Sequence, residues 1–190
     1  MHERTHSFVI RGVDHRVTTA SGIFSADRLD KGTQVLLDHV PDPPGQGTFL
    51  DLGCGWGPIA TVMSLESPGA SVWAVDVNSR ALDLTARNAA ANGAAGVRTL
   101  KAEEALAAST ETDTRFDVIW SNPPVRIGKD AMHEMLASWL GRLAPTGVAY
   151  LVVQRNLGAD SLIGWLNGRG FRASKFASKK GFRIIEVRPA

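Results

Sequence analysis

The sequence predicts an α/β fold with a seven-stranded, mostly parallel sheet, a C-terminal antiparallel hairpin and helices on both faces. Short apolar runs alternate with helix-forming segments from residue 48 onward, which is the pattern of strand–helix–strand units with parallel strands. The run Val148–Val153 is apolar without interruption, as expected of a central strand covered on both faces. Two strand-like segments near the C-terminus flank Lys179-Lys180-Gly181, which predicts the hairpin.

The elements follow one another in a regular order. Apolar and β-branched residues predict strands at 48–52, 71–76, 97–101, 116–121, 148–153, 171–177 and 182–187. Helices are predicted at 58–66, 79–92, 129–143 and 157–167. Ser79 is a suitable N-cap and Gly93 a stop for the second helix, and Pro145 with Gly147 ends the third.

The chain is predicted to form a single domain, 1–190, because 190 residues suffice for one hydrophobic core. A turn-rich segment, 40–47, separates an N-terminal extension (1–40) from the α/β core (48–190). Within the extension, Asp30-Lys31-Gly32-Thr33 indicates the start of a helix, with Thr33 as a candidate cap.

Composition indicates a soluble, cytoplasmic protein. Hydrophobic residues make up 44% and charged residues 21% of the chain. Cys54 is the only cysteine, so no intrachain disulfide forms, and the histidines lack metal-ligand spacing. No apolar run approaches membrane-spanning length and the first residues lack the apolar core of a signal peptide. We therefore expect neither a membrane partner nor a metal.

A glycine-rich turn follows the first predicted strand of the core. In FLDLGCGWGPIA, the residues Gly53, Gly55 and Gly57 allow a tight turn and close approach of a ligand to the backbone. Asp51 stands where a dinucleotide-binding fingerprint has an apolar residue, and a carboxylate there suits a ligand with an ammonium group better than a pyrophosphate. By itself the glycine pattern is weak evidence, because a simple tight turn also explains it.

Asp76 ends the second predicted strand, 19 residues after Gly57, where a carboxylate accepts hydrogen bonds from ribose hydroxyls. Val77 follows it, and Ala102-Glu103 follows the third strand, beside an adenine in this arrangement. Glu103 has a second interpretation, as an acidic residue in the first turn of a helix.

The combined motifs resemble a known family. DLGCGWG, Asp76 and SNPP are similar to the motifs of class I S-adenosylmethionine-dependent methyltransferases, which have a Rossmann-like fold. Within that class, TTASGIFSADRLDKGTQVLL together with NPPVRIGK resembles the small-domain ribosomal RNA guanine-N2 methyltransferases, in a single-domain form. The resemblance covers nearly the whole chain. It implies that S-adenosyl-L-methionine is the cofactor and S-adenosyl-L-homocysteine its product, in a monomer or weak homodimer.

The resemblance also implies roles for individual residues. Asp51 and the three glycines line the methionine moiety, Asp76 holds the ribose, and Ala102 with Glu103 lies near the adenine. Val77 also belongs to the cofactor site. Asn122 faces the transferable methyl group. A segment of the N-terminal extension folds back over the cofactor through Phe24, Asp30, Gly32 and Thr33.

Asn122-Pro123-Pro124 is the predicted catalytic element. The lone pair of an exocyclic amine is delocalised into its ring, so the amine is a poor nucleophile. The Asn122 side-chain oxygen and the Pro123 carbonyl are two acceptors that orient the nitrogen, and prolines fix that backbone. The other interpretation is a purely structural turn at the end of a strand.

The substrate is predicted to be RNA, most specifically a guanosine in ribosomal RNA or a ribosomal subunit precursor. Val125 replaces the aromatic residue usual after this motif, which weakens the assignment of guanine because stacking is lost. The residues expected to hold RNA are Val125, Arg126, Lys129, Lys179 and Lys180. Two alternatives stay open: a protein-glutamine or small-molecule amine methyltransferase, and a non-catalytic RNA-binding or assembly factor with the same fold.

Overall fold

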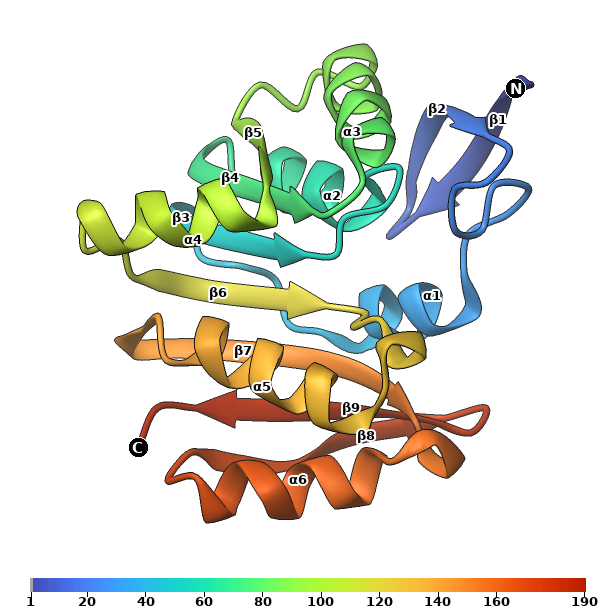
Figure 1. The fold of residues 1–190 in the computed structure, drawn as a ribbon. Coiled ribbons are helices and arrows are strands. Elements are labelled where there is room, and N and C mark those ends of the chain that lie inside the picture. Colours follow the sequence, from blue (N-terminus) through green and yellow to red (C-terminus); the bar gives the residue numbers. More distant parts are fainter. Residues whose placement is uncertain (1) are drawn as a thin grey trace.

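The computed structural model describes residues 2–190 and consists of a seven-stranded sheet between two helical layers, with a separate two-stranded hairpin (Figure 1). The strand order is β5-β4-β3-β6-β7-β9-β8. All neighbouring pairs from β5 to β7 are parallel, whereas β9 is antiparallel to both β7 and β8. The predicted fold class is confirmed. The strands are β3 (Gln46–Leu52), β4 (Gly69–Asp76), β5 (Val97–Lys101), β6 (Phe116–Ser121), β7 (Leu143–Gln154), β8 (Arg172–Lys179) and β9 (Phe182–Arg188).

Helices cover both faces of the sheet because alternate strand residues point to opposite sides. In β3, Phe49 packs with one face and Leu50 with the other. One face carries α1 (Lys31–His39), α2 (Pro58–Glu66) and α3 (Ser79–Ala91), and the other carries α4 (Ala102–Glu111), α5 (Lys129–Leu140) and α6 (Ala159–Gly168).

The third predicted helix ends earlier than expected. Leu143 belongs to β7, where it pairs with Phe116 in the sheet, so the helix stops at Leu140. The expected helix stops therefore lie inside the strand, next to an irregularity in its register with β6. Gly147 is required there, since an added Cβ would lie 2.6 Å from the Phe116 carbonyl oxygen. Helix α4 was not among the predicted elements, although Glu103 suggested a helix start.

The N-terminal extension contains a hairpin that the sequence analysis did not predict. Strands β1 (Glu3–Ile10) and β2 (Val13–Ala20) pair antiparallel and lie against α3 (Figure 1). The Asn88 side chain accepts from the Thr18 backbone N–H at 2.7 Å and donates to its carbonyl at 2.9 Å. Asn88 also donates to the Trp56 carbonyl at 2.8 Å, so one buried amide connects this hairpin to the glycine-rich turn.

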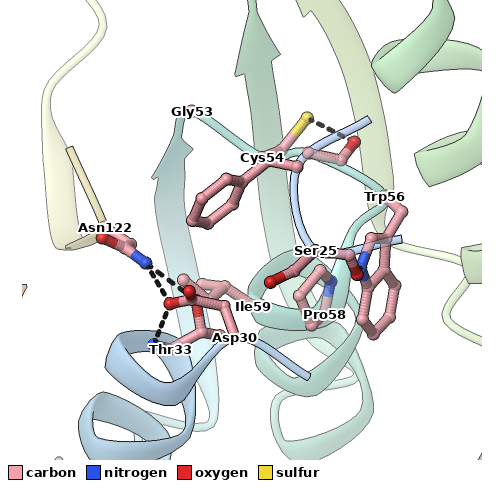
Figure 2. A pocket seen from close by; sticks show the side chains of 11 residues that line it. Ser25, Asp30, Thr33, Gly53, Cys54, Trp56, Pro58, Ile59 and Asn122 are labelled. Carbon is pink, nitrogen blue, oxygen red and sulfur yellow. Dashed lines mark hydrogen bonds between the residues drawn. The ribbon is translucent and has the colours of Figure 1, made fainter. Parts of the chain in front are cut away.

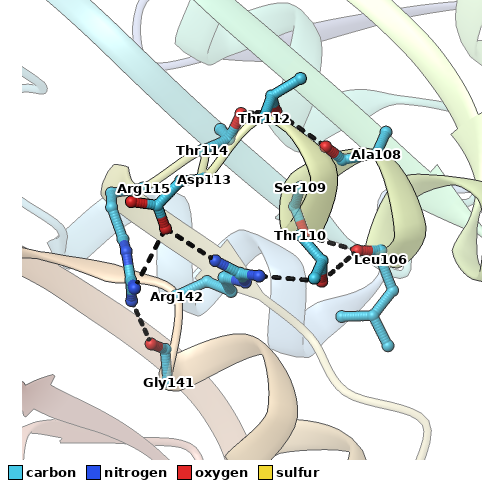
Figure 3. A network of polar contacts seen from close by, with 10 residues as sticks. All are labelled: Leu106, Ala108, Ser109, Thr110, Thr112, Asp113, Thr114, Arg115, Gly141 and Arg142. Atoms are coloured by element: carbon cyan, nitrogen blue, oxygen red, sulfur yellow. Dashed lines mark hydrogen bonds and ion pairs between the residues drawn. The ribbon is translucent and has the colours of Figure 1, made fainter.

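The two ends of the parallel strands have different characters. At the amino ends, a polar network joins the segment before β6 to the turn before β7 (Figure 3). Arg142 contacts Asp113 and Thr110, and Arg115 donates to the Gly141 carbonyl. Asp51, Asp76 and Ser121 lie toward the opposite, carboxyl ends, where ligands bind in open α/β sheets. Within residues 2–190, the helices all fall short of the length and apolarity needed to cross a membrane.

Candidate functional site

The glycine-rich turn after β3 is held by the neighbouring strand β4 and by α3. The N–H groups of Gly53 and Cys54 donate to the Val75 carbonyl at 2.8 and 3.0 Å. Gly53, Gly55 and Gly57 all have positive φ angles, of 81°, 57° and 98°. At Gly57 an added Cβ would lie 3.0 Å from the backbone and side chain of Thr85, so only glycine fits against α3.

Asp51 lies beneath this turn and is completely buried. Its Oδ2 accepts a hydrogen bond from the Ala60 N–H at 2.9 Å. Ala60 is the third residue of α2, and the N-cap of this helix, Gly57, has no side chain, so Asp51 supplies the acceptor that the free N–H group needs. Its Oδ1 has no hydrogen-bond partner among residues 2–190. Burial raises the Asp51 pKa to about 8, opposed by the Ala60 hydrogen bond and assisted by the negative charge of Asp76. A cationic ligand group close by would favour the ionised carboxylate.

Asp76 ends β4 and is engaged by two backbone N–H groups. Its Oδ2 accepts from Gly55 at 3.0 Å and its Oδ1 from Asn78 at 2.9 Å. The N-cap of α3 is Asn78, whose side chain accepts from the Arg80 N–H, and not Ser79 as predicted.

The neighbours of Asp76 form an open surface. Val77 is 82% exposed, an unusual position for an apolar side chain. Ala102 and the exposed Glu103 begin α4 on the adjacent strand end, where Asp76 pairs with Lys101.

Asn122 follows β6 and is tied to the N-terminal extension (Figure 2). Its Nδ2 donates to Asp30 Oδ2 at 2.7 Å and to Thr33 Oγ1 at 3.1 Å. Asp30 is the N-cap of α1 and accepts from the Thr33 N–H at 3.0 Å, so the expectation that Thr33 is the cap was wrong. The described residues donate no hydrogen bond to Asn122 Oδ1, so this oxygen has no protein donor.

One pocket brings these segments together (Figure 2). It is lined by the 24–33 segment, the glycine-rich turn, the start of α2 and Asn122, through Phe24, Ser25, Asp30, Thr33, Gly53, Cys54, Gly55, Trp56, Pro58, Ile59 and Asn122. The other predicted cofactor residues lie outside this lining, namely Gly32, Asp51, Gly57, Asp76, Val77, Ala102 and Glu103.

Ser25 was not among the predicted site residues. Its backbone carbonyl accepts a hydrogen bond from the Trp56 indole N–H at 3.3 Å, which fastens the 24–33 segment to the glycine-rich turn. The only signal for it in the sequence was its place in the GIFS motif. Burial raises the pKa of the Cys54 thiol well above its ordinary value, which agrees with a packing role for this side chain.

Basic side chains lie at the same end of the sheet as Asn122, where the parallel strands have their carboxyl ends. Arg126 and Lys129 follow the Asn-Pro-Pro motif and are exposed. Phe182 pairs with Gln154 at the carboxyl end of β7, so the hairpin turn with Lys179 and Lys180 lies at this end of the sheet as well.

Six basic residues lie in the segment from Arg169 to Arg183, which has no acidic residue and suggests a single basic patch, but in the fold they do not form one patch. Arg172 begins β8 and pairs with Arg188 at the other end of the sheet, and Arg169 follows α6 and contacts Glu134. Arg183 pairs with Asp160. The basic surface available near the pocket is therefore smaller than the sequence suggests.

Comparison with known proteins identifies the family. A family model described as "Methyltransferase small domain" matches residues 14–186. The chain belongs to the methyltransferase small domain family. It is a class I S-adenosylmethionine-dependent methyltransferase related to ribosomal RNA small subunit methyltransferase C, and the predicted cofactor is confirmed. Among the described residues, no group of three or more His, Cys, Asp or Glu side chains is arranged to hold a metal ion.

This methyltransferase matches some relatives over nearly their whole length and others over less than half of it. It is 32% identical to an uncharacterized protein, YbxB, of Bacillus subtilis, over 98% of this chain and 92% of that protein. It is 35% identical to ribosomal RNA small subunit methyltransferase C of Shewanella loihica over 72% of this chain, but spans only 39% of that protein. The structure of a 16S rRNA N2 methyltransferase (RsmC) from T. thermophilus, in complex with AdoMet and guanosine, matches with a TM-score of 0.78 at 23% identity, over 99% of this chain and 51% of that one. The last match supports the fold.

Two features of the glycine-rich turn suit a cofactor with an ammonium group, although Asp51 itself is completely buried and lies outside the pocket lining. The unpartnered Asp51 Oδ1 is a buried acceptor next to the glycine-rich turn, as a ligand with an ammonium group requires. Within the described chain, nothing lies within 4 Å of where a Cβ on Gly55 would stand, so the turn leaves space on its pocket side.

Asp51→Asn is expected to stabilise the cofactor-free methyltransferase increasingly as pH rises. The Asp51 pKa is about 8 in the folded chain against an ordinary value of 3.8, so between these values the unfolded chain has lost a proton that the folded chain retains. The free energy of unfolding of the wild type therefore falls as pH rises from about 4 to about 8, by at most about 1.4 kcal/mol per pH unit. The variant has no carboxyl group at this position, so its free energy of unfolding lacks this pH dependence. Urea unfolding at pH 5 and pH 8 measures the difference, with Asp38→Asn at an exposed carboxylate as control. A variant-to-wild-type difference that is equal at both pH values would contradict the burial argument.

Proposed function

We propose that this methyltransferase transfers a methyl group from S-adenosylmethionine to the exocyclic N2 amine of a guanosine in ribosomal RNA. The observation that carries the proposal is Asn122 in the pocket lining, whose Nδ2 is fixed by Asp30 and Thr33 while its Oδ1 receives no hydrogen bond from the described residues. The names of related proteins, which include ribosomal RNA small subunit methyltransferase C, support the substrate class.

The cofactor would be held along the carboxyl ends of β3, β4 and β5. Asp51 and the glycine-rich turn would hold the methionine moiety, and Phe24, with the segment that runs from it through Gly32 to Thr33, would cover it. To bind the ribose, the Asp76 carboxylate would accept hydrogen bonds from the ribose hydroxyls, either in place of its present backbone N–H donors or in addition to them. The exposed face of Val77 and the start of α4 at Ala102 and Glu103 would flank the adenine. S-adenosylmethionine, when bound, supplies the electrophilic methyl group on a sulfonium.

The reacting amine would be oriented by Asn122 Oδ1 and the Pro123 carbonyl. Each acceptor takes one N–H, which turns the nitrogen lone pair toward the pocket and makes attack geometrically favourable. Pro123 is buried and Pro124 limits the backbone angles, so the carbonyl is held in place. Once methylated, the cationic amine is acidic enough to lose its proton to water, and a strong general base is unnecessary.

The target base would reach the pocket unpaired or flipped out of a helix, because an exocyclic amine in a stacked pair is inaccessible. Val125 is only partly buried and packs against the core next to α5, whereas Ile127 is 49% exposed. We therefore extend the apolar contact to the base to include Ile127, with the Arg126 guanidinium as a stacking or phosphate-binding group.

Replacing both Lys179 and Lys180 with alanine is expected to weaken RNA binding and reduce its salt dependence. Each phosphate contact that is lost removes about one counterion from the salt slope, so the logarithmic slope should fall by at most about 2. Titration of an rRNA fragment at several KCl concentrations measures this slope. Arg172→Ala, at the other end of β8 and of the sheet, is the matched control. An equal fall of the salt slope in the control variant would contradict RNA binding at the end of the sheet that carries Lys179 and Lys180.

The test of the proposed function is transfer of labelled methyl from S-adenosylmethionine to total rRNA, followed by nuclease digestion and nucleoside analysis. Label in N2-methylguanosine is the expected result. Label found only in proteins or small amines would replace the RNA assignment, and absence of cofactor binding would favour a non-catalytic RNA-binding factor.

A further inference from the structure

We propose that Asp30 is a positioning residue, which fixes the Asn122 amide so that its oxygen and not its nitrogen faces the reacting amine. The inference rests on the proposed function, because it assigns Asn122 Oδ1 as an acceptor. It adds that the catalytic orientation of a residue after β6 is set by a carboxylate from the N-terminal extension, 92 residues away in the sequence.

The two ends of an asparagine amide have nearly the same shape but opposite hydrogen-bonding roles. An orientation is therefore fixed only by a partner that has a single role. A hydroxyl such as Thr33 Oγ1 is donor or acceptor and would accommodate either end. An ionised carboxylate only accepts, so Asp30 Oδ2 at 2.7 Å requires the NH2 group of Asn122. The flipped amide would place two oxygens at this distance.

Asp30 is itself held firmly. The same Oδ2 accepts from the Thr33 N–H at 3.0 Å as the N-cap of α1, so one oxygen serves both the helix and Asn122. Gly32 makes room for this arrangement, since an added Cβ would lie 3.1 Å from Asp30 Oδ2 and 3.0 Å from the Phe182 ring. The buried side chains of α1 then anchor the cap to the sheet.

A simple capping role would explain the α1 contact without any effect on catalysis, and two substitutions separate these roles. Asp30→Ser keeps a good N-cap, because serine caps helices as well as aspartate does, but its side chain is too short to reach Asn122. Asp30→Asn keeps both contacts, since the Thr33 N–H selects the oxygen of the new amide, and that oxygen then faces Asn122. Positioning therefore predicts different outcomes for two variants with equally capped helices.

The experiment compares the two variants with the wild-type protein in single-turnover methyl transfer to rRNA, in cofactor binding and in thermal unfolding. We expect Asp30→Ser to lower the transfer rate about 10- to 100-fold, as small misplacements of a catalytic group do, with cofactor affinity and Tm close to those of Asp30→Asn. We expect Asp30→Asn to restore most of the lost rate. Equal rates in the two variants, or a rate loss fully accompanied by unfolding, would overturn the proposal.

A second measurement keeps the inference testable if rRNA is not the substrate. Side-chain amide resonances of Asn122, assigned by the Asn122→Ala variant in 15N–1H correlation spectra, report the carboxylate contact without any turnover. We expect these resonances to move in Asp30→Ser and to stay near their wild-type positions in Asp30→Asn. Unchanged resonances in Asp30→Ser would overturn the positioning role, whereas absence of rRNA methylation by the wild type alone would overturn only the proposed function.

Discussion

Asn122→Ala is expected to remove methyl transfer while cofactor binding and the fold persist. The substitution deletes the acceptor that would orient the amine, and loss of one such preorganised group costs about 100- to 1000-fold in rate, or about 3 to 4 kcal/mol. The structural cost is smaller, since Asn122 is partly exposed and Asp30 retains its bond to the Thr33 N–H. We expect about 1 kcal/mol of stability to be lost. Methyl transfer under saturating cofactor, together with urea unfolding, measures both quantities.

Asn122→Asp is the informative companion variant. It keeps two side-chain oxygens, but one of them would face Asp30 Oδ2 at the position where the NH2 group now lies 2.7 Å away. Repulsion between the carboxylates should displace the side chain or the 24–33 segment, so this variant is expected to be slow as well. Transfer rates in Asn122→Ala within tenfold of the wild type would contradict an amine-orienting role for this residue.

The sheet and most of its helices were predictable because their signals are local. The glycines after β3, the uninterrupted apolar run in β7 and the amphipathic spacing of α5 each occupy a short window, and each window indicates its own element. Alternation of strands and helices then restricts the topology strongly. For the same reason the end of α5 was misplaced, since whether Leu143 joins a helix or a strand depends on its pairing with Phe116.

The N-terminal hairpin gave weaker signals. Its turn consists of Arg11 and Gly12, with φ angles of 50° and 78°, and arginine is not a residue that usually marks such a turn. Its strands are largely polar, and they are stabilised by hydrogen bonds to Asn88 on α3 and Asn92 at its C-cap, together with the burial of a few apolar residues such as Val17. A two-stranded hairpin is marginal by itself, so its existence depends on tertiary contacts that no local pattern records.

The most informative contact of the candidate site was equally invisible in the sequence. Asp30, Thr33 and Asn122 each belong to a motif, but their hydrogen bonds join two motifs that lie far apart in the chain. The linear basic segment was misleading in the opposite way. Arg172 and Lys179 are close in sequence, but they begin and end the same strand, β8, and therefore lie at opposite ends of the sheet.

Gly57→Ala is expected to destabilise the protein by about 2 to 4 kcal/mol and to abolish cofactor binding, because positive φ and overpacking act together there. Gly57 has φ of 98°, and an added Cβ would stand 3.0 Å from Thr85 Cα, Cγ2 and Oγ1. Thr85 cannot move away easily, since it is buried in α3 and its hydroxyl donates to the Gly55 carbonyl at 2.9 Å. The methyl group would therefore push the glycine-rich turn toward the pocket and away from Asp51. Urea unfolding and calorimetric titration with S-adenosylmethionine measure the two effects.

Gly93→Ala is the matched control for the backbone contribution. Gly93 has φ of 76°, follows α3, and has no described atom within 4 Å of an added Cβ. It should lose only the cost of a left-handed conformation, about 1 kcal/mol, and keep cofactor binding. The excess loss in Gly57→Ala then measures the packing of the turn against α3 alone. Equal losses in the two variants would mean that the turn yields freely, and that close contact with Thr85 is not what shapes the cofactor pocket.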